Sequence, residues 1–372
     1  MEEKLIIITI ENFSRAQLLK AQLESEGIEC SLSNLNLIQA SVSEGVRVMV
    51  KETDVKRAIK IYIAIKGQYK RDGKKKLKKT RHIRKILVPV DFSENSLRTA
   101  YFALEIGHIY GASVRFLHVY YSPAIDMIAA PDVNISQFNL DIVINEILTK
   151  AKEDMKVFLE KMNVYVAKRA LVDAKISHRI IEGVVSDTIL SAAETFVPGL
   201  IIMGTHGQSN KSSSILGSVV WKIIQKSKIP VLSVPENSSF DDQQNAYNIM
   251  FTTDLDDVDY MTIRKLIVIL SPFKNIKLHC VHASDKPINA YQKAKMDEIK
   301  DYLSSVISFP LHFKFLESKD YINAFNNYVK DNKIDLICMS TRKRNIIERF
   351  FNPSLAKKMV YHSTTPLMII HV

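Results

Sequence analysis

The stretch Lys85-Ile-Leu-Val-Pro-Val-Asp91 indicates the fold of most of the chain. Its apolar run, Ile86–Val90, is typical of a strand that helices cover on both faces, and Pro89 must lie near the strand end because proline has no N–H to donate. Further strands are expected at Val114–Val119, His178–Ile181, Leu200–Met203 and Val231–Val234. Helical stretches separate these strands, which predicts crossover connections and a doubly wound, five-stranded parallel sheet of Rossmann-like α/β type.

The helices between these strands have start and stop signals of their own. Ser93 is a candidate N-cap for the helix after the first strand, and Gly111 stands just after the expected end of that helix. A second, long helix is expected near Asn139–Met162, where apolar residues recur at helical spacing. Another helix should begin near Ser218.

The same strand pattern occurs twice in the chain, which predicts tandem domains of one kind. The paired stretches are Lys85–Asp91 with Asn248–Asp254, Val114–Val119 with Ile276–Val281, Leu200–Thr205 with Leu336–Thr341, and Pro230–Val234 with Pro366–Ile370. We therefore expect one α/β domain over 85–236 and a second over 246–372. The polar, turn-rich residues 237–245 between them are typical of a short linker.

The first 66 residues alternate too quickly between element types to belong to this repeat. Strands are expected at Leu5–Ile10, Cys30–Asn34 and Val46–Val50, with a helix at Ser14–Glu26 and another at the end. Ser14 is the expected N-cap and Gly27 the left-handed C-cap of the first helix. Residues 1–66 are thus predicted to form a small α+β domain. They contain no paired catalytic groups, which favours a ligand or interaction module over an enzyme.

Most of the net charge of +11 comes from one segment, the basic linker 67–84. From Gly67 to Lys85 there are ten Lys or Arg residues against the single Asp72, so this stretch contributes +9. A solvated, self-repelling linker is the favoured interpretation. The alternative, a nonspecific anchor for acidic lipid or nucleic acid, is not favoured because the remaining parts of the chain are nearly neutral.

Composition excludes several classes of protein. Apolar residues make up 47% of the chain and charged residues 24%, as in ordinary globular proteins. No apolar run approaches the roughly 18 residues that span a membrane, and the N-terminus lacks a signal-peptide pattern. Cys30, Cys280 and Cys338 are too widely separated to indicate a disulfide framework or a zinc site, so buried thiols in a cytoplasmic protein are expected.

A glycine pattern marks the expected binding site. Gly204-Thr-His-Gly207 leaves a predicted strand, and Gly217-Ser218 enters a predicted helix. Glycines allow the backbone to approach an anion closely, and a helix N-terminus favours negative charge, so this segment is predicted to bind phosphate. Asp91 and Val119 also stand at carboxyl ends of strands, where open parallel sheets bind ligands.

Each of these residues also has a purely structural interpretation. For Asp91 the structural alternative is to cap the following helix or make a turn, and for Gly204 and Gly207 it is a tight turn. The place of Asp91 at the strand end beside the glycines favours the ligand interpretation for all three. His206 and Lys211 are either phosphate contacts or solvated loop side chains, and these two readings stay open. For Ser209–Ser214 a mobile loop is favoured over phosphorylation. His118 and His279 are interpreted as core residues within strands.

Three stretches together resemble the universal stress protein family. They are Lys85-Ile-Leu-Val-Pro-Val-Asp-Phe-Ser93, Met203-Gly-Thr-His-Gly207 and Ile229-Pro-Val-Leu-Ser-Val234. The resemblance implies an ATP site in the first copy, with Asp91 near the ribose and the backbone of Val119 near adenine. The same resemblance assigns the phosphates to Gly204, Gly207, Gly217 and Ser218, with His206 beside them, and the pocket lining to Pro89, Val90, Met203 and Val219. Mg²⁺ is an optional companion of the ATP.

The second copy departs from the family's glycine pattern. It keeps Asp254 and Ser354, but Ser340, Lys343 and Pro353 stand where the three glycines are expected. Proline removes an amide and side chains crowd positions that need bare backbone, so no tight ATP binding is expected there. Residues 1–66 in turn resemble the family of putative prokaryotic signal-transducing domains, in Glu26-Gly27-Ile28 and Gly45–Val50.

These features favour a nucleotide-responsive sensor or regulator of stress adaptation that works by binding. An ATP hydrolase or a phosphoryl or adenylyl transferase is the alternative, weakened by the lack of a G-x-x-x-x-G-K-[ST] loop and of an acidic pair for Mg²⁺. A non-nucleotide interaction scaffold is the second alternative. The family resemblance also implies that the two copies pair through their last strands as an intrachain pseudo-dimer, while a homodimer and a further protein partner stay open.

Overall fold

The computed structural model describes residues 5–11, 13–33, 46–62, 83–122, 140–171, 175–205, 217–236, 238, 246–255, 257–273, 275–341 and 365–371. The chain divides into two compact units, residues 1–80 and residues 81–372. Each unit is described by itself.

The first unit is a small antiparallel sheet with a helix packed on it. Its elements are β1 (Leu5–Glu11), α1 (Phe13–Ser25), β2 (Cys30–Ser33) and β3 (Val46–Lys51), followed by a helical segment over 55–62. The strand order is β1-β3-β2, and Leu19 and Leu23 of α1 are buried with Val48 and Val50 of β3. The predicted order of elements is therefore observed.

The caps of α1 agree only in part with the sequence-based expectation. Gly27 has the predicted left-handed backbone, with φ of 75°. The prediction for Ser14 was wrong, because the helix already begins at Phe13 and Ser14 lies inside its first turn. A residue within the first turn has helical backbone and cannot serve as N-cap.

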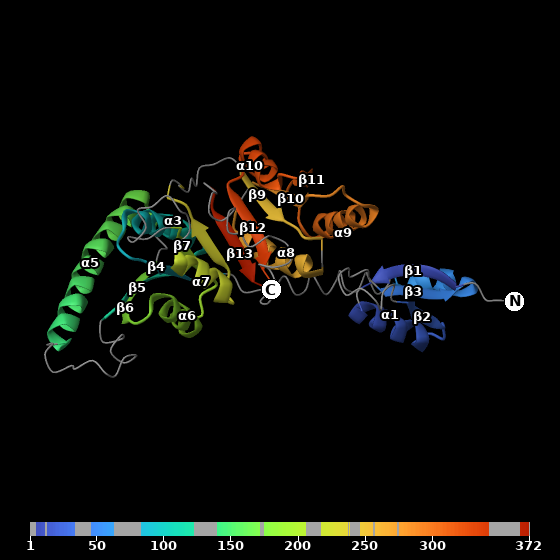
Figure 1. The fold of residues 1–372 in the computed structure, drawn as a ribbon, viewed down its shortest axis with the longest axis horizontal. Helices are drawn as coiled ribbons and strands as arrows, with labels where there is room; N and C mark the ends of the chain where they lie inside the picture. The colour runs from blue at the N-terminus through green and yellow to red at the C-terminus, as the bar shows by residue number, and fades with distance from the viewer. Residues whose placement is uncertain are drawn as a thin grey trace. The chain divides into compact units, whose positions relative to one another are not determined.

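The second unit contains one ten-stranded sheet that both halves of the repeat build (Figure 1). The strands of the first half are β4 (Lys85–Pro89), β5 (Ser113–Tyr120), β6 (Lys175–Glu182), β7 (Leu200–Gly204) and β8 (Val231–Val234). Those of the second half are β9 (Tyr247–Thr252), β10 (Ile276–Ser284), β11 (Leu311–Glu317), β12 (Leu336–Thr341) and β13 (Leu367–His371). Each half is a five-stranded parallel sheet, as predicted.

Both halves have the same strand order. The sheet runs β11-β10-β9-β12-β13-β8-β7-β4-β5-β6, so in each half the first strand lies between the second and the fourth. The chain therefore changes direction across the sheet between β4 and β7, and again between β9 and β12. Ligands of open α/β sheets bind at the carboxyl ends of the two strands that flank such a switch point.

Helices cover both faces of the sheet. In the first half they are α3 (Glu94–Tyr110), α5 (Leu140–Arg169), α6 (Val185–Phe196) and α7 (Ser218–Lys226). In the second half they are α8 (Asp257–Leu270), α9 (Ala290–Val306) and α10 (Tyr321–Asp331). One hydrophobic core joins α3, α5, α8 and α9 to one face, and a second joins α6, α7 and α10 to the other. Each core continues through both halves.

The two halves meet through their last strands. β8 and β13 are antiparallel, with Leu367 opposite Ser233, Met368 opposite Leu232 and Ile369 opposite Val231. Leu232 and Met368 occupy equivalent positions of the repeat, so the pairing is centred on a residue and its own counterpart. Such self-matching contacts are the mark of a two-fold interface, here formed within one chain.

A second contact near this pseudo-two-fold axis joins α3 to α8. The Tyr110 hydroxyl donates a hydrogen bond to the Ile269 carbonyl in the last turn of α8. The Tyr110 ring also meets the Phe273 ring edge to face at 5.9 Å between centroids. Burial raises the pKa of this tyrosine well above its ordinary value, so it remains a neutral donor.

The backbone hydrogen bonds confirm the repeat and correct one alignment. Gly199 N donates to Lys85 O as Asp335 N donates to Asn248 O, at equal positions of the two halves. Val90 N, however, donates to Leu117 O, while its counterpart Thr253 N donates to Val281 O.

The second strands therefore match Leu117 to Val281. The sequence alignment, which matched Val119 to Val281, was two residues out of register. Two strands of similar apolar pattern can slip by two residues and keep the same face buried, so their pattern alone could not reveal the error.

Local signals of the first half are otherwise confirmed. The Ser93 side chain accepts a hydrogen bond from Ser96 N as N-cap of α3, and Gly111 ends that helix with φ of 59°. Pro89 is the last residue of β4. α5 ends at Arg169, seven residues beyond the expected Met162.

The cysteines and the helices bear on two further expectations. Cys30, Cys280 and Cys338 are free and buried, and burial raises the pKa of each thiol. Among the described residues, none of the helices combines the length and the apolar character that crossing a membrane requires.

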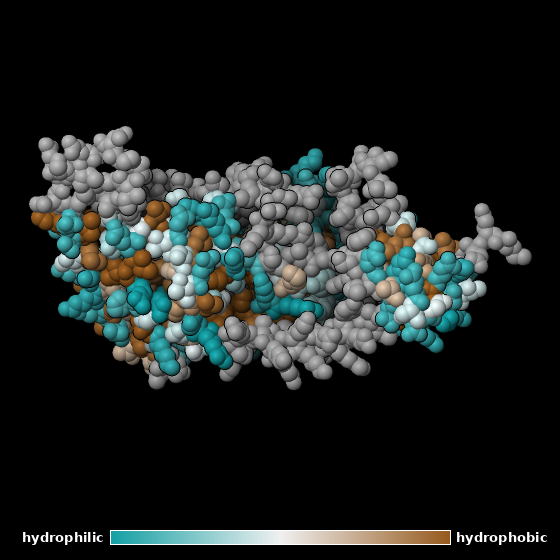
Figure 2. Space-filling view, turned by 90° about the horizontal axis from the view of Figure 1, so that it is seen from below, coloured by the Kyte–Doolittle hydropathy of each residue, from teal (hydrophilic) through white to brown (hydrophobic). Residues whose placement is uncertain are grey.

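Exposed apolar side chains are concentrated in the first half of this unit. Of the described residues, the large exposed ones there are Tyr121, Ile142, Val143, Val157, Val164, Val184 and Val197, against Met261 in the second half. Figure 2 shows brown, hydrophobic residues gathered among hydrophilic ones on the left part of the face that it views. The long helix α5 contributes four of the exposed residues.

Candidate functional site

Three neighbouring strands of the first half bring the predicted residues to one edge of the sheet. Ile86 lies opposite Leu200 in the parallel pairing of β4 with β7, which places Val90 level with Gly204 when the register is continued. The pairing of Pro89 with Leu117 in β5 likewise places Asp91 level with Val119. Adjacent strands are about 4.8 Å apart. Asp91, Val119 and Gly204 thus meet at the switch point between β4 and β7.

Asp91 is held in a tight turn between β4 and α3. Its Oδ1 accepts hydrogen bonds from Ser93 N at 3.1 Å and from Ser93 Oγ at 2.6 Å. Phe92, between them, has a left-handed backbone with φ of 63°. Such a conformation costs roughly 1–2 kcal/mol for a residue other than glycine. The turn role that the sequence left open for Asp91 is therefore real, and it fixes where the carboxylate stands.

His118 stabilises this strained turn from the neighbouring strand. Its Nδ1 lies 2.9 Å from the Val90 carbonyl, which makes Nδ1 the protonated nitrogen, and its ring packs on Phe92 with centroids 4.3 Å apart. The sequence predicted only a core residue here. A histidine inside a strand pattern gives no sign of its partner, because the partner is the carbonyl of an adjacent strand.

Gly204 is required by packing as well as by any ligand. A Cβ at this position would lie 2.9 Å from Asn95 Nδ2 and 2.9 Å from Thr99 Oγ1, both in α3. Asn95 and Thr99 are buried and one helical turn apart. Sequence reasoning missed these two residues, although polar residues four apart on the buried face of a helix were a usable signal.

Gly217 brings the end of the glycine segment back to its start. Its N–H donates a hydrogen bond of 2.8 Å to the Thr205 carbonyl, next to Gly204. Gly217 is also the N-cap of α7, with φ of −58°. An added Cβ would meet only Thr205 O at 3.7 Å, an ordinary contact. No contact with the described residues therefore requires a glycine at this position.

The remaining predicted residues lie in or beside this edge. Val90, Val119 and Met203 are buried in the two cores, Pro89 and Val219 are half-buried, and Ser218 is exposed as the first residue of α7. His206 and Gly207 lie outside the described residues, as do Lys211 and Ser209–Ser214. Among the residues that are described, no group of three or more His, Cys, Asp or Glu side chains is arranged to hold a metal ion.

A family model described as "Universal stress protein family" matches residues 82–235 and 313–371, more than half of the chain. The chain belongs to the universal stress protein family. Residues 5–66 match a second model, described as "Putative prokaryotic signal transducing protein". Both resemblances that the sequence motifs indicated are thereby confirmed.

Curated relatives and solved structures agree with this assignment. One universal stress protein of Methanocaldococcus jannaschii is 29% identical over 167 residues, which are 42% of this chain and 97% of the relative. A second one from the same organism is 30% identical over 151 residues, 41% of this chain and 81% of the relative. The crystal structure of a universal stress protein from Archaeoglobus fulgidus matches with a TM-score of 0.59 at 16% identity, over 77% of this chain and 98% of that one. This last match shows the fold.

The second universal stress segment repeats the turn but fills its edge differently. Leu255, after Asp254, is left-handed with φ of 60°, and His282 Nδ1 lies 2.8 Å from the Thr253 carbonyl, as His118 does at Val90. Thr253 Oγ1 also donates to Asp259 Oδ2 at 2.5 Å, and both side chains are buried.

The glycine positions also differ between the segments. Ser340 stands at the position of Gly204, and Lys343, Pro353 and Ser354 lie outside the described residues.

Proposed function

We propose that the first universal stress segment binds ATP, accompanied by Mg²⁺, at the switch point between β4 and β7. The observation that carries the proposal is the hydrogen bond from Gly217 N to Thr205 O. It joins the two ends of the glycine segment at the N-terminus of α7, beside the strand end that presents Asp91. A helix N-terminus next to bare backbone is a favourable environment for phosphate.

The proposed residue roles follow the arrangement around this edge. Asp91 accepts hydrogen bonds from the ribose hydroxyls, and the backbone of Val119 faces adenine. Gly204, Gly207, Gly217 and Ser218 surround the phosphates, with His206 beside them. Pro89, Val90, Met203 and Val219 supply apolar surface around the base and ribose. Because the side chains of Val90 and Met203 are buried in the two cores, the lining that these two residues offer is mainly their backbone.

The second segment does not bind ATP tightly in this proposal. Its buried carboxylate, Asp259, is already hydrogen-bonded to Thr253 within the turn. Ser340 adds a side chain where Gly204 offers bare backbone. One nucleotide per chain is therefore expected.

The proposed biological role is that of a nucleotide-responsive regulator of stress adaptation in the cytoplasm. The two segments form an intrachain pseudo-dimer, supported by the self-matched pairing of Leu232 with Met368. ATP acts as a signal if it binds one arrangement of the chain more tightly than another, because a ligand shifts an equilibrium only by its difference in affinity. The three free thiols suit a reducing compartment.

The test is to purify the protein gently, denature it and identify any released nucleotide by mass. The variant to compare is Gly217→Val. The backbone angles of Gly217 suit valine, and a Cβ added there would lie 3.7 Å from the Thr205 carbonyl oxygen, an ordinary contact distance. We expect one ATP per wild-type chain and none in the variant. The urea unfolding midpoint of the variant should match that of nucleotide-free wild type, which shows that the loss concerns binding and not folding.

Two other results would each favour another function. Phosphate release from ATP at a rate that Gly217→Val abolishes would favour the hydrolase or transferase. Absence of nucleotide after purification, together with no binding when ATP and Mg²⁺ are added, would contradict the proposal and favour an interaction scaffold.

A further inference from the structure

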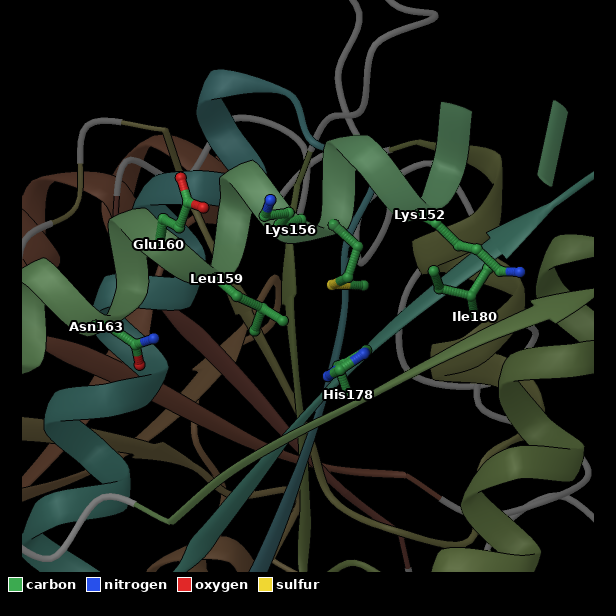
Figure 3. A pocket seen from close by; sticks show the side chains of 8 residues that line it. Lys152, Lys156, Leu159, Glu160, Asn163, His178 and Ile180 are labelled. Carbon is green, nitrogen blue, oxygen red and sulfur yellow. The ribbon is translucent and has the colours of Figure 1, made fainter. Parts of the chain in front are cut away.

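A cavity outside the predicted nucleotide residues lies between α5 and the edge strand β6 (Figure 3). Its volume is about 350 Å³, within the range of small-molecule sites in proteins. None of the side chains that line it belongs to the nucleotide site proposed above. The cavity is therefore a candidate for a different ligand.

The floor of this cavity is apolar. Met155 is 1% exposed and belongs to the hydrophobic core, whereas Leu159 and Ile180 are half-buried and border the opening. In Figure 3 Leu159 projects from the helix toward the strand that carries His178 and Ile180. Alternate residues of a strand face one side, so His178 and Ile180 both point toward α5. A ligand here would cover apolar surface from two separate elements.

The rim has one excess positive charge. Lys156 and Glu160 stand one helical turn apart with opposite charges, and Figure 3 shows both on the upper side of the helix. Lys152 instead extends from the helix above Ile180. Within the described part of the chain neither Lys152 nor His178 makes a hydrogen bond or ion pair, although both line the cavity. Lys152 is thus a cation beside an apolar floor, and no anion among the described residues pairs with it.

The walls are fixed by contacts away from the cavity. The buried carboxylate Glu105 in α3 accepts hydrogen bonds from Tyr165 at 2.9 Å and from Arg169 at 2.8 Å, both in α5. Burial, and then the bond to Glu105, raises the pKa of Tyr165 to about 12, so the phenol stays protonated and keeps donating. β6 pairs with β5 along all eight of its residues. The cavity consequently exists before any ligand arrives, which lowers the cost of binding.

We propose that this cavity binds a small organic anion with an apolar ring or chain. Its carboxylate, sulfonate or phosphate group would pair with Lys152, and its apolar part would cover Met155, Leu159 and Ile180. The positive rim disfavours a cation, and the apolar floor disfavours a fully polar ion such as inorganic phosphate. The glycine segment of the first half takes no part, so we expect binding here to be independent of ATP.

The test uses 1-anilinonaphthalene-8-sulfonate, a fluorescent apolar sulfonate, titrated into the full-length protein with saturating ATP and Mg²⁺. We expect saturable binding at one site. Lys152→Gln should weaken it about fivefold, the scale of one partly solvated charge pair. Lys150→Gln is the matched control, because it removes the same charge from an exposed position of α5 that does not line the cavity.

A second variant tests the apolar floor. Leu159→Trp should weaken binding by placing a larger side chain in the opening of the cavity, with urea unfolding used to verify that the protein remains folded. Binding that persists at saturating ATP and Mg²⁺ separates this site from the nucleotide site. Equal loss in Lys152→Gln and Lys150→Gln, or unchanged binding in a folded Leu159→Trp protein, would overturn the proposal.

Discussion

The two universal stress segments of this chain share a scaffold and differ at the edge where a ligand would sit. Both have a left-handed residue after the aspartate, Phe92 in one and Leu255 in the other, and both hold that turn with a histidine on the next strand. Only the first segment has the glycines. The histidine-held turn therefore belongs to the fold, because it is present in both segments, whereas no contact of Gly217 within the described part of the chain requires a glycine.

The interior of the turn shows a second difference. In the second segment Asp259 binds Thr253, and both are buried. The equivalent residues of the first segment are Ser96 and Val90, and the buried Ser96 hydroxyl has no hydrogen-bond partner among the described residues. In the second segment the Thr253 hydroxyl and Asp259 Oδ2 therefore satisfy each other within the turn. This comparison suggests four experiments, taken from the largest expected effect to the smallest.

The largest effect is expected where the two segments meet. Leu232→Asp places a carboxylate in the buried centre of the β8–β13 pairing and should lower the free energy of unfolding by more than about 4 kcal/mol, since no basic partner is paired with it there. Met368→Asp should have a similar effect because it is the counterpart. Urea unfolding measures both.

A control swaps the two residues across the join. Leu232→Met with Met368→Leu keeps the summed volume and should cost less than about 1.5 kcal/mol. If the aspartate variants are no less stable than the swapped protein, the pairing of β8 with β13 does not hold the segments together.

The second effect concerns the stability of the folded protein in mild acid, which we expect to depend on His279. His279 lies at the position that Arg115 occupies in the first segment, where the Arg115 guanidinium packs 3.8 Å from the centroid of the Phe196 ring. Burial, with smaller contributions from His312 and Lys277, lowers the pKa of His279 from 6.5 to about 4. Its Nδ1 is instead bound to the Tyr328 hydroxyl at 2.9 Å.

The unfolded chain takes up a proton at this histidine near pH 6.5, and the folded chain does so only near pH 4. The free energy of unfolding should therefore fall as the pH is lowered, by about 2 kcal/mol between pH 7 and pH 5. His279→Phe should remove that part of the pH dependence in urea unfolding. Equal losses in wild type and variant over this range would show that His279 does not titrate as its burial implies.

The third effect compares ATP affinity after substitution of Asp91 in the first segment and of Asp254 in the second. Asp91→Asn keeps an oxygen for the turn with Ser93 but removes the charge, so ATP affinity should fall about tenfold, the scale of one charge-assisted hydrogen bond. Asp254→Asn is the matched control in the second segment and should leave ATP affinity unchanged. Titration calorimetry with ATP and Mg²⁺ measures both. Equal effects of the two substitutions would mean that the segments do not differ in nucleotide binding.

The smallest effect concerns the α3–α8 contact. Tyr110→Phe removes the hydrogen bond to the Ile269 carbonyl in the last turn of α8 and should cost about 1 kcal/mol in urea unfolding. ATP binding should not change, because Tyr110 lies at the opposite end of α3 from Asp91. A loss of ATP affinity in this variant would instead indicate that the axis and the nucleotide site are coupled.

Much of the fold could be predicted because its signals are local. The strand Val231–Val234 was predicted to the residue, and Ser93, Gly111 and Gly27 mark helix ends as expected. The alignment of Val119 with Val281 failed because it depended on pairing between strands, which apolar pattern alone leaves open to a shift of two residues.

The site was predictable as a set of positions but not as a set of contacts. The glycines and Asp91 are visible in the sequence, and their meeting at one edge follows from parallel strands. The contact of Gly204 with Asn95 and Thr99, and that of His118 with the Val90 carbonyl, join residues far apart in the chain. The local sequence around each of these residues does not indicate which distant residue it contacts.

The pairing of Leu232 with Met368 has a consequence for how the two segments can change. In a symmetric dimer of identical chains every substitution appears twice, so a loss on one side is a loss on both. Here the two strands of the symmetric join, β8 and β13, belong to different parts of one sequence, so each can be substituted alone. The chain between the two segments keeps them together at high effective concentration. Each segment can therefore differ at its edge without a change in the other: the first has the glycines, and the second has Ser340, Lys343 and Pro353 in their place.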